Sequence, residues 1–151
     1  MKKQVLFHKK HELVDSLLST IHIDGICYAS IGVIKNDVIY SAFSHNKWQQ
    51  YYIDNELHIN DPSFQAAIKI PELPIFWDSV ALYTDAEVKV MQKRREAVGA
   101  RGGVTLCFNS LDKQLLLTIG TSKESTMVST ITKALSSLSL PEVLCSQLSS
   151  I

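Results

Sequence analysis

The chain has 151 residues, the usual length of one domain, and its hydrophobic content of 46% is enough to build a core. Charged residues make up 20%, a composition that excludes wholesale disorder. The 15 basic and 15 acidic residues give a formal net charge of zero. This balance argues against a dedicated nucleic-acid surface, which would be basic.

The cysteines and the apolar runs indicate where the chain works. Cys27, Cys107 and Cys145 sit among apolar residues and form no CxxC pair, so we expect free thiols in a reducing compartment. The apolar run near the N-terminus is too short for a signal-peptide core, and no run is long enough to span a bilayer. We therefore expect a cytoplasmic chain with no membrane partner. The histidines show no metal-ligand spacing, and no cofactor is implied.

The N-terminal part of the chain predicts a helix followed by a hairpin. Apolar residues at helical spacing predict a helix over residues 10–21. The β-rich runs 26–34 and 38–43 flank a turn signal at 35–37. Two such runs around a short turn predict an antiparallel pair of strands.

Two short helices and an extended segment are predicted next. Asn46 is a candidate cap for a first helix. Asp61 followed by Pro62 predicts the start of a second helix over 63–68, because aspartate caps and proline suits the first turn. Prolines then break the chain around a short extended segment, 75–77.

A longer helix is predicted from Thr84 or Asp85 to about Val98. Lys93 to Arg95 reads as a solvated face of this helix. Its apolar stripe is narrow and consists of Val90, Met91, Ala97 and Val98.

The C-terminal part predicts a second hairpin and a last helix. The hairpin pairs residues 104–108 with 115–119. A strong helical stripe follows over residues 127–138.

Strands grouped as hairpins, rather than alternating with helices one by one, favour an α+β fold. We predict an αβα sandwich with a central antiparallel sheet of about five strands flanked by helices, as in PAS-like and GAF-like sensor domains. The expected domain organisation is a single domain over residues 1–151.

One short region carries the groups that a ligand site needs. Trp48 and Tyr52 stand four residues apart and share a helix face, and Asp61 follows. An indole N–H, a phenol and a carboxylate in apolar surroundings suit a small apolar ligand with a polar head. Each also has a plain explanation: the two aromatic residues as an ordinary core stripe, and Asp61 as a helix cap.

The order and spacing of these residues resemble the ligand-binding domain of LuxR-type acyl-homoserine-lactone receptors. Trp48, Tyr52, Asp61 and Pro62 match the family pattern, and Trp77 matches an aromatic wall residue. Two strand motifs match as well, Gly103-Val104-Thr105 and Leu116-Leu117-Thr118.

The resemblance implies a role for each residue. Trp48 would donate to the lactone carbonyl, Asp61 would accept from the amide N–H, and Tyr52 would donate to the acyl carbonyl. Ser63 would help to satisfy the Asp61 carboxylate, and Thr118 would offer a second hydroxyl. Trp77 would form an aromatic wall. Independently of the resemblance, Cys27 and Ala29 share one face if residues 25–33 form a strand, and with Phe64 and Phe76 they are candidates to surround the acyl tail; ordinary core packing is the alternative for each of them.

The resemblance implies a sensing protein rather than an enzyme. Such a protein would bind an N-acyl-homoserine lactone between the sheet and the helices. The resemblance also implies a homodimer, or a heterodimer with a LuxR-type receptor. The chain ends before a helix-turn-helix domain, so we expect no DNA binding by this chain, whether it is a fragment or stands alone. Two alternatives stay open: a ligand-independent anti-activator that pairs with a full-length receptor, and a GAF- or PAS-like sensor of another small molecule.

Overall fold

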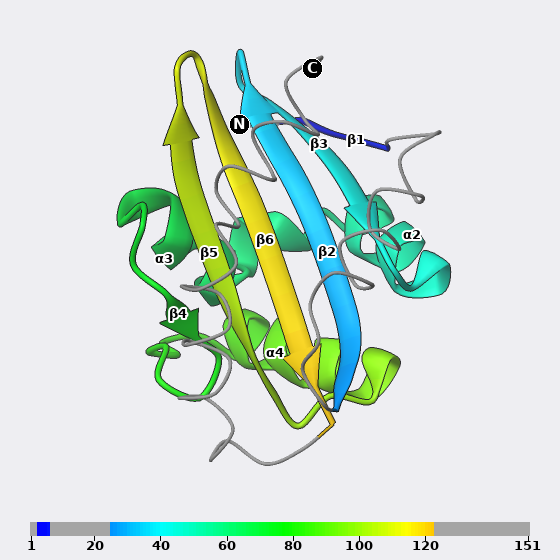
Figure 1. Ribbon diagram of the computed structural model, residues 1–151. Helices are drawn as coiled ribbons and strands as arrows, with labels where there is room; N and C mark the ends of the chain where they lie inside the picture. The colour runs from blue at the N-terminus through cyan, green and yellow to red at the C-terminus, as the bar shows by residue number, and fades with distance from the viewer. Residues whose placement is uncertain (1–2, 7–24, 123–151) are drawn as a thin grey trace.

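A six-stranded sheet forms the centre of the computed structural model, which describes residues 3–6 and 25–122 (Figure 1). The strand order is β1-β3-β2-β6-β5-β4, and every neighbouring pair is antiparallel except β1 and β3. The strands are β1 (Lys3–Leu6), β2 (Ile26–Lys35), β3 (Val38–Phe43), β4 (Ile75–Phe76), β5 (Gly102–Ser110) and β6 (Lys113–Thr121).

Five of the six strands, β2 to β6, pair antiparallel, and together with the helices they confirm the predicted α+β class. Both hairpins pair as expected, and β3 has the predicted bounds. The parallel edge strand β1 was not predicted. The helices predicted over 10–21 and 127–138 lie outside the described residues.

Two-residue turns set the register of both hairpins. Asn36 and Asp37 have φ values of 52° and 62° and join β2 to β3, in which Lys35 pairs with Val38. Positive φ at both central residues suits the right-handed twist of the strands, and asparagine and aspartate tolerate it. The second turn places Leu111 at a φ of 52° between β5 and β6.

The described helices all lie on one face of the sheet (Figure 1). They are α2 (Asn46–Asp54), the 3-10 helix η1 (Leu57–Asn60), α3 (Pro62–Lys69) and α4 (Asp85–Val98). Among helices of the described ranges, none has the length and apolar character needed to cross a membrane.

The helix starts follow the local chemistry. Thr84 caps α4, since its side chain accepts from the backbone N–H of Glu87, and Gly99 ends the helix in the left-handed conformation at φ 68°. Asp61 caps α3 and Pro62 is the first helical residue, as predicted. Asn46 is not a cap: it lies inside α2, and His45 stands at the cap position without a side-chain hydrogen bond.

Among the described residues, two buried clusters lie between the sheet and the helices. The first is rich in aromatic residues and gathers beneath α2 and α4; it contains Tyr28, Phe43, Trp48, Tyr52, Trp77, Val90, Met91, Val98 and Ala100. The second lies beneath α3 and contains Ile34, Ile39, Phe64, Ala67, Cys107 and Leu116. The polar groups described next lie between these clusters.

Candidate ligand-binding site

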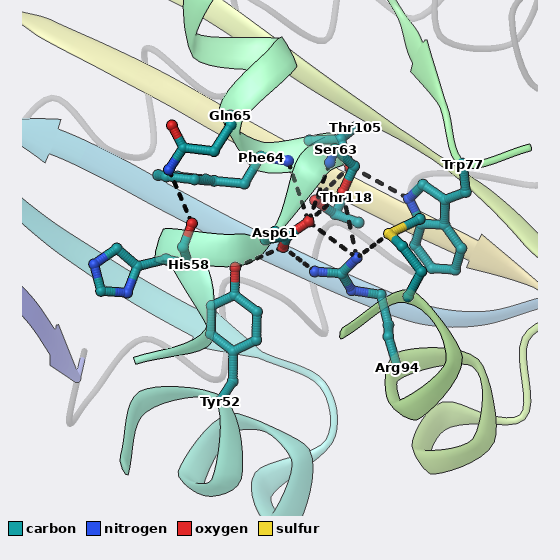
Figure 2. Close-up of polar contacts among 11 residues, drawn as sticks. Tyr52, His58, Asp61, Ser63, Phe64, Gln65, Trp77, Arg94, Thr105 and Thr118 are labelled. Atoms are coloured by element: carbon teal, nitrogen blue, oxygen red, sulfur yellow. Dashed lines mark hydrogen bonds and ion pairs between the residues drawn. The ribbon is translucent and has the colours of Figure 1, made fainter. Parts of the chain in front are cut away.

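Asp61 lies at the centre of a network of buried polar contacts (Figure 2). Its carboxylate is 1% exposed, and Oδ1 accepts from the backbone N–H groups of Ser63 (3.2 Å) and Phe64 (3.3 Å). The Ser63 hydroxyl donates to the same oxygen at 2.8 Å. The other oxygen, Oδ2, accepts from the Tyr52 hydroxyl at 2.6 Å. Asp61 is therefore both the cap of α3 and the acceptor that orients Tyr52.

Arg94 on α4 supplies the positive charge that faces this carboxylate (Figure 2). Its Nη2 donates to Asp61 Oδ2 in a close ion pair. Its Nη1 lies 3.4 Å from Asp61 Oδ1 and 3.3 Å from the Ser63 hydroxyl oxygen. Only 4% of Arg94 is exposed, so this is a buried salt bridge between two helices.

The prediction that Lys93 to Arg95 form a solvated face of α4 is therefore wrong at Arg94. Met91, Arg94 and Val98 follow at i, i+3 and i+7, so they share the buried side of the helix. Ala97, which was predicted to belong to that stripe, is exposed. The run of basic residues gives no sign of this burial in the sequence; the reason for it is the buried carboxylate of Asp61, which requires a compensating charge.

The charges fix the protonation of all three groups. Burial alone would raise the pKa of Asp61, but the Arg94 charge and the hydrogen bonds to the carboxylate outweigh burial and hold the pKa below its ordinary 3.8. Burial and the Asp61 charge raise the pKa of the Tyr52 phenol well above 10.0. Burial opposes the charge on Arg94, but Asp61 outweighs it and raises the pKa of the guanidinium. At neutral pH the site thus contains a carboxylate, a guanidinium and a neutral phenol.

Three aromatic rings surround the Arg94 guanidinium. Its Cζ lies 5.3 Å from the ring centroid of Trp77, 5.7 Å from that of Tyr52 and 5.9 Å from that of Trp48. A cation over aromatic faces is attracted by their quadrupoles, and the attraction grows when water is excluded. The indole, phenol and carboxylate named from the sequence therefore converge, and they do so on Arg94.

Trp48 retains an unused donor. The residue is 3% exposed, and within residues 3–6 and 25–122 its Nε1 forms no hydrogen bond of good geometry, although the Tyr28 hydroxyl lies close enough for this N–H to lower the pKa of Tyr28. A buried N–H without an acceptor is costly, so it marks a position where an acceptor is favoured. Trp48 also borders an open groove of about 610 Å³ between α2 and α4, lined by His45, Asn46, Lys47, Trp48, Tyr51, Lys93, Glu96 and Ala97.

Trp77 rests flat on the sheet because two glycines leave room for it. Gly103 and Gly120 are cross-strand partners on β5 and β6. A Cβ on Gly103 would lie 2.6 Å from Trp77 Cε2, and one on Gly120 would lie 3.1 Å from Trp77 Cη2. The Trp77 indole N–H donates to the Thr105 hydroxyl at 3.3 Å, and this hydroxyl lies 3.3 Å from that of Thr118 (Figure 2).

A cavity of about 40 Å³ lies beside this network, between the sheet and the helices. Ligand pockets commonly enclose roughly 300–1,000 Å³, so the hollow is much smaller than an acyl-lactone site needs. Arg94, Tyr52 and Asp61 form part of its wall. The rest of the polar lining is made of hydroxyl groups from Tyr28, Ser30, Ser41, Ser63, Thr105 and Thr118.

The structure brings some of the predicted site residues together and separates others. Those that line the small cavity are Tyr52, Asp61, Ser63, Phe64 and Thr118. Trp48 and Trp77 flank Arg94 next to it. Cys27 donates from its thiol to the Gly120 carbonyl at 3.6 Å, and Ala29 is buried without lining the cavity. Phe76 lines a separate hollow near Pro74 and Val80.

Strand β2 shows why Ala29 is absent from the cavity wall. Tyr28, Ser30 and Gly32 line the cavity and share one parity along the strand, whereas Ala29 has the other. Ile31 has the parity of Ala29 but also reaches the cavity, and Cys27 lies where the pairing register with β6 shifts between Ile26 and Tyr28. Both sides of β2 are buried, so alternation of polar and apolar residues does not reveal which side faces the helices.

These features define an α+β domain with a buried polar site between sheet and helices, and comparison with known proteins identifies the family. The family model of the autoinducer binding domain matches residues 9–140, and the chain belongs to this family. The family description is that of a domain that binds a signal molecule. A comparison with curated proteins found no match.

Solved structures with low sequence identity share the fold. The N-acylhomoserine-lactone-dependent LuxR-family transcription factor CepR2 from Burkholderia cenocepacia is 16% identical, with a TM-score of 0.61 over 87% of this chain and 77% of CepR2. SdiA from Escherichia coli is also 16% identical, with a TM-score of 0.60 over 95% of this chain and 63% of SdiA. SdiA in complex with octanoyl-rac-glycerol is 15% identical, with a TM-score of 0.57 over 92% of this chain and 59% of that chain.

Proposed function

We propose that this chain senses a small acyl-bearing signal, an N-acyl-homoserine lactone or a related compound, between the sheet and helices α2, α3 and α4. The observation that carries the proposal is that the buried Trp48 indole N–H, beside Tyr52, Asp61 and the aromatic cluster, forms no hydrogen bond of good geometry in the described part of the chain. A ligand carbonyl at this indole would satisfy the donor, and an acyl chain would extend the apolar cluster.

Related folds support this ligand class. CepR2 is described as dependent on N-acylhomoserine lactone, and SdiA holds octanoyl-rac-glycerol. Both ligands combine an acyl chain with a polar head, joined through an acyl carbonyl. The groove that Trp48 borders between α2 and α4 is the access route we propose for such a molecule.

Uptake requires the site to expand, because the cavity of about 40 Å³ cannot hold an acyl chain. The ligand would replace contacts that Arg94 and the aromatic rings now make with one another. A ligand that binds only the folded chain stabilises it by mass action, so binding is measurable as a rise in melting temperature.

The test is thermal unfolding with increasing N-octanoyl-homoserine lactone. At a concentration of about 100 times the Kd the stabilisation is about 2.7 kcal/mol, which raises the melting temperature by several degrees. Trp48→Phe removes the indole donor with little change in volume and should weaken binding about fivefold or more while the fold is kept. Undiminished binding by Trp48→Phe would contradict the assigned donor.

The second candidate is a ligand-independent protein that pairs with a full-length LuxR-type receptor. It is favoured by Arg94, which fills the space among Trp48, Tyr52 and Trp77 with a side chain of the protein itself. Mass spectrometry of small molecules extracted from the purified protein separates the two candidates. An acyl-bearing compound in stoichiometric amount supports the sensor, whereas its absence together with no thermal shift supports the pairing role.

A further inference from the structure

Asp61 has no acceptor capacity left for a ligand. An ionised carboxylate offers about four lone-pair sites. Six N–H or O–H contacts already converge on it: two backbone N–H groups, the hydroxyls of Ser63 and Tyr52, and two guanidinium nitrogens of Arg94. A ligand amide N–H could bond to this carboxylate only if one of these donors left.

The unused polar capacity around Asp61 consists of donors. Trp48 Nε1 and Arg94 Nε are both buried and form no hydrogen bond of good geometry in the described part of the chain. The nearby hydroxyls of Thr105 and Thr118 lie 3.3 Å apart, and each can either donate or accept. The site is therefore rich in donors, and its one carboxylate is occupied.

We infer that Arg94 is a specificity-determining residue, which shifts the preference of the site from amide-bearing to ester-bearing acyl ligands. The inference rests on the proposed function. An ester and an amide of the same shape differ by one N–H, which needs an acceptor when it is buried. Because Arg94 occupies the Asp61 carboxylate, the amide loses the advantage that a free carboxylate would give it.

The experiment compares two ligands that differ only at this position. N-octanoyl-homoserine lactone carries an amide N–H, and α-octanoyloxy-γ-butyrolactone has an ester oxygen in its place. Calorimetric titration of the wild-type chain should give a Kd for the ester within threefold of that for the amide, or lower. An amide that binds at least tenfold more tightly would overturn the inference, since Asp61 would then be accepting from the ligand.

Substitution of Arg94 tests its role directly. In Arg94→Met the Asp61 Oδ1 keeps its donors from Ser63 and Phe64, whereas Oδ2 keeps only the Tyr52 hydroxyl and regains a free lone pair. The ratio of the ester Kd to the amide Kd should then rise about tenfold relative to the wild type. A protein in which Arg94 only holds the helices together would lose affinity for both ligands without this change in ratio.

A neighbouring residue provides the control. Arg95→Met removes the same charge from α4 at a partly exposed position, where Arg95 pairs with Asp78 at 2.9 Å. In this variant the ratio of the ester Kd to the amide Kd should stay at the wild-type value. If Arg94→Met does not fold, Arg94→Gln is used in its place. The comparison of the ester Kd with the amide Kd in the wild-type chain tests the inference even without a variant.

The outcomes separate the inference from the proposed function. An unchanged ratio in the Arg94 variants, with both ligands still bound, overturns the inference alone. If neither ligand binds the wild type nor any folded variant, the proposed function fails and the inference fails with it.

Discussion

Asp61 combines a helix cap, which the sequence predicted, with a buried ion pair to Arg94, which it did not. One oxygen caps α3, and the other binds Tyr52 and Arg94. The two tasks coexist because a carboxylate has two oxygens with separate lone pairs. The ion pair ties α4 to the start of α3, so its loss should affect the stability of the chain as well as the site.

Asp61→Asn should destabilise the protein by about 3–5 kcal/mol, because it leaves the buried Arg94 charge unpaired. Asparagine is a good helix cap, so the loss reports on the charge. Denaturant unfolding measures the change, and Asp61→Asn/Arg94→Met should recover most of it. Asp78→Asn, at an ion pair that is 46% exposed on the carboxylate side, is the control and should cost less than about 1 kcal/mol. Equal effects of the two single variants would show that the buried pair is dispensable.

The lowered pKa of Asp61 predicts a pH dependence of stability. A carboxyl with a depressed folded-state pKa contributes stability that is fully present above its unfolded pKa, near 3.8, and is lost as the pH falls through the folded pKa. The difference in the free energy of unfolding between wild type and Asp61→Asn should therefore narrow as the pH falls below 3.8. Urea unfolding at a series of pH values measures it, and a constant difference would contradict the assignment.

Strands β5 and β6 support the site through the glycine pair under Trp77. Both positions look like ordinary strand glycines in the sequence, where their lack of a side chain has no visible reason. In the structure the absent Cβ atoms form a flat surface on which the indole lies. This contact sets the position of Trp77 over Arg94.

Gly103→Ala should destabilise the chain by about 1–3 kcal/mol, because its Cβ would lie 2.6 Å from both the Ile119 carbonyl oxygen and Trp77. Gly102→Ala is the matched control on the same strand. Its Cβ would meet only Asp78 Oδ2, at 3.7 Å, so the change should stay within about 0.5 kcal/mol. Thermal unfolding of both variants measures the difference. A Gly103→Ala protein as stable as Gly102→Ala would show that Trp77 is not held against the sheet.

Elements whose chemistry is local could be predicted from the sequence. The hairpin turn at Asn36-Asp37, the caps at Thr84 and Asp61, and the end of α4 at Gly99 each depend on residues a few positions apart. Strand β1 was missed because four residues without alternation give no signal, and its pairing partner lies more than 30 residues away.

The site could be predicted only in part, and the prediction came from residue types and their spacing rather than from turn and cap chemistry. Trp48, Tyr52 and Asp61 were found from their types and spacing. Arg94 was missed because it sits between Lys93 and Arg95, and a run of basic residues resembles a solvated face. Only the partner contact with Asp61, 33 residues earlier, reveals its burial.

The helix layer and the sheet enclose very little free space at the site, and this predicts how a ligand would enter. Because the cavity of about 40 Å³ must open first, the observed association rate should reach a plateau as ligand concentration rises. Stopped-flow measurements of tryptophan fluorescence with N-octanoyl-homoserine lactone give this rate. If the observed rate instead rises linearly with ligand concentration up to the fastest rate that a millisecond mixing time can resolve, the site is already open before the ligand binds.

The parallel pairing of Lys3–Leu6 with β3 has a consequence for how the protein behaves in concentrated solution. A bare outer strand offers its backbone N–H and C=O groups to any other chain, which is a common start of aggregation. Here residues 3–6 occupy that position along Val38 to Ser41. Strand β1 then forms the edge of the sheet itself and is only four residues long, and short edge strands limit edge-to-edge association, so removal of residues 3–6 should expose the longer edge of β3.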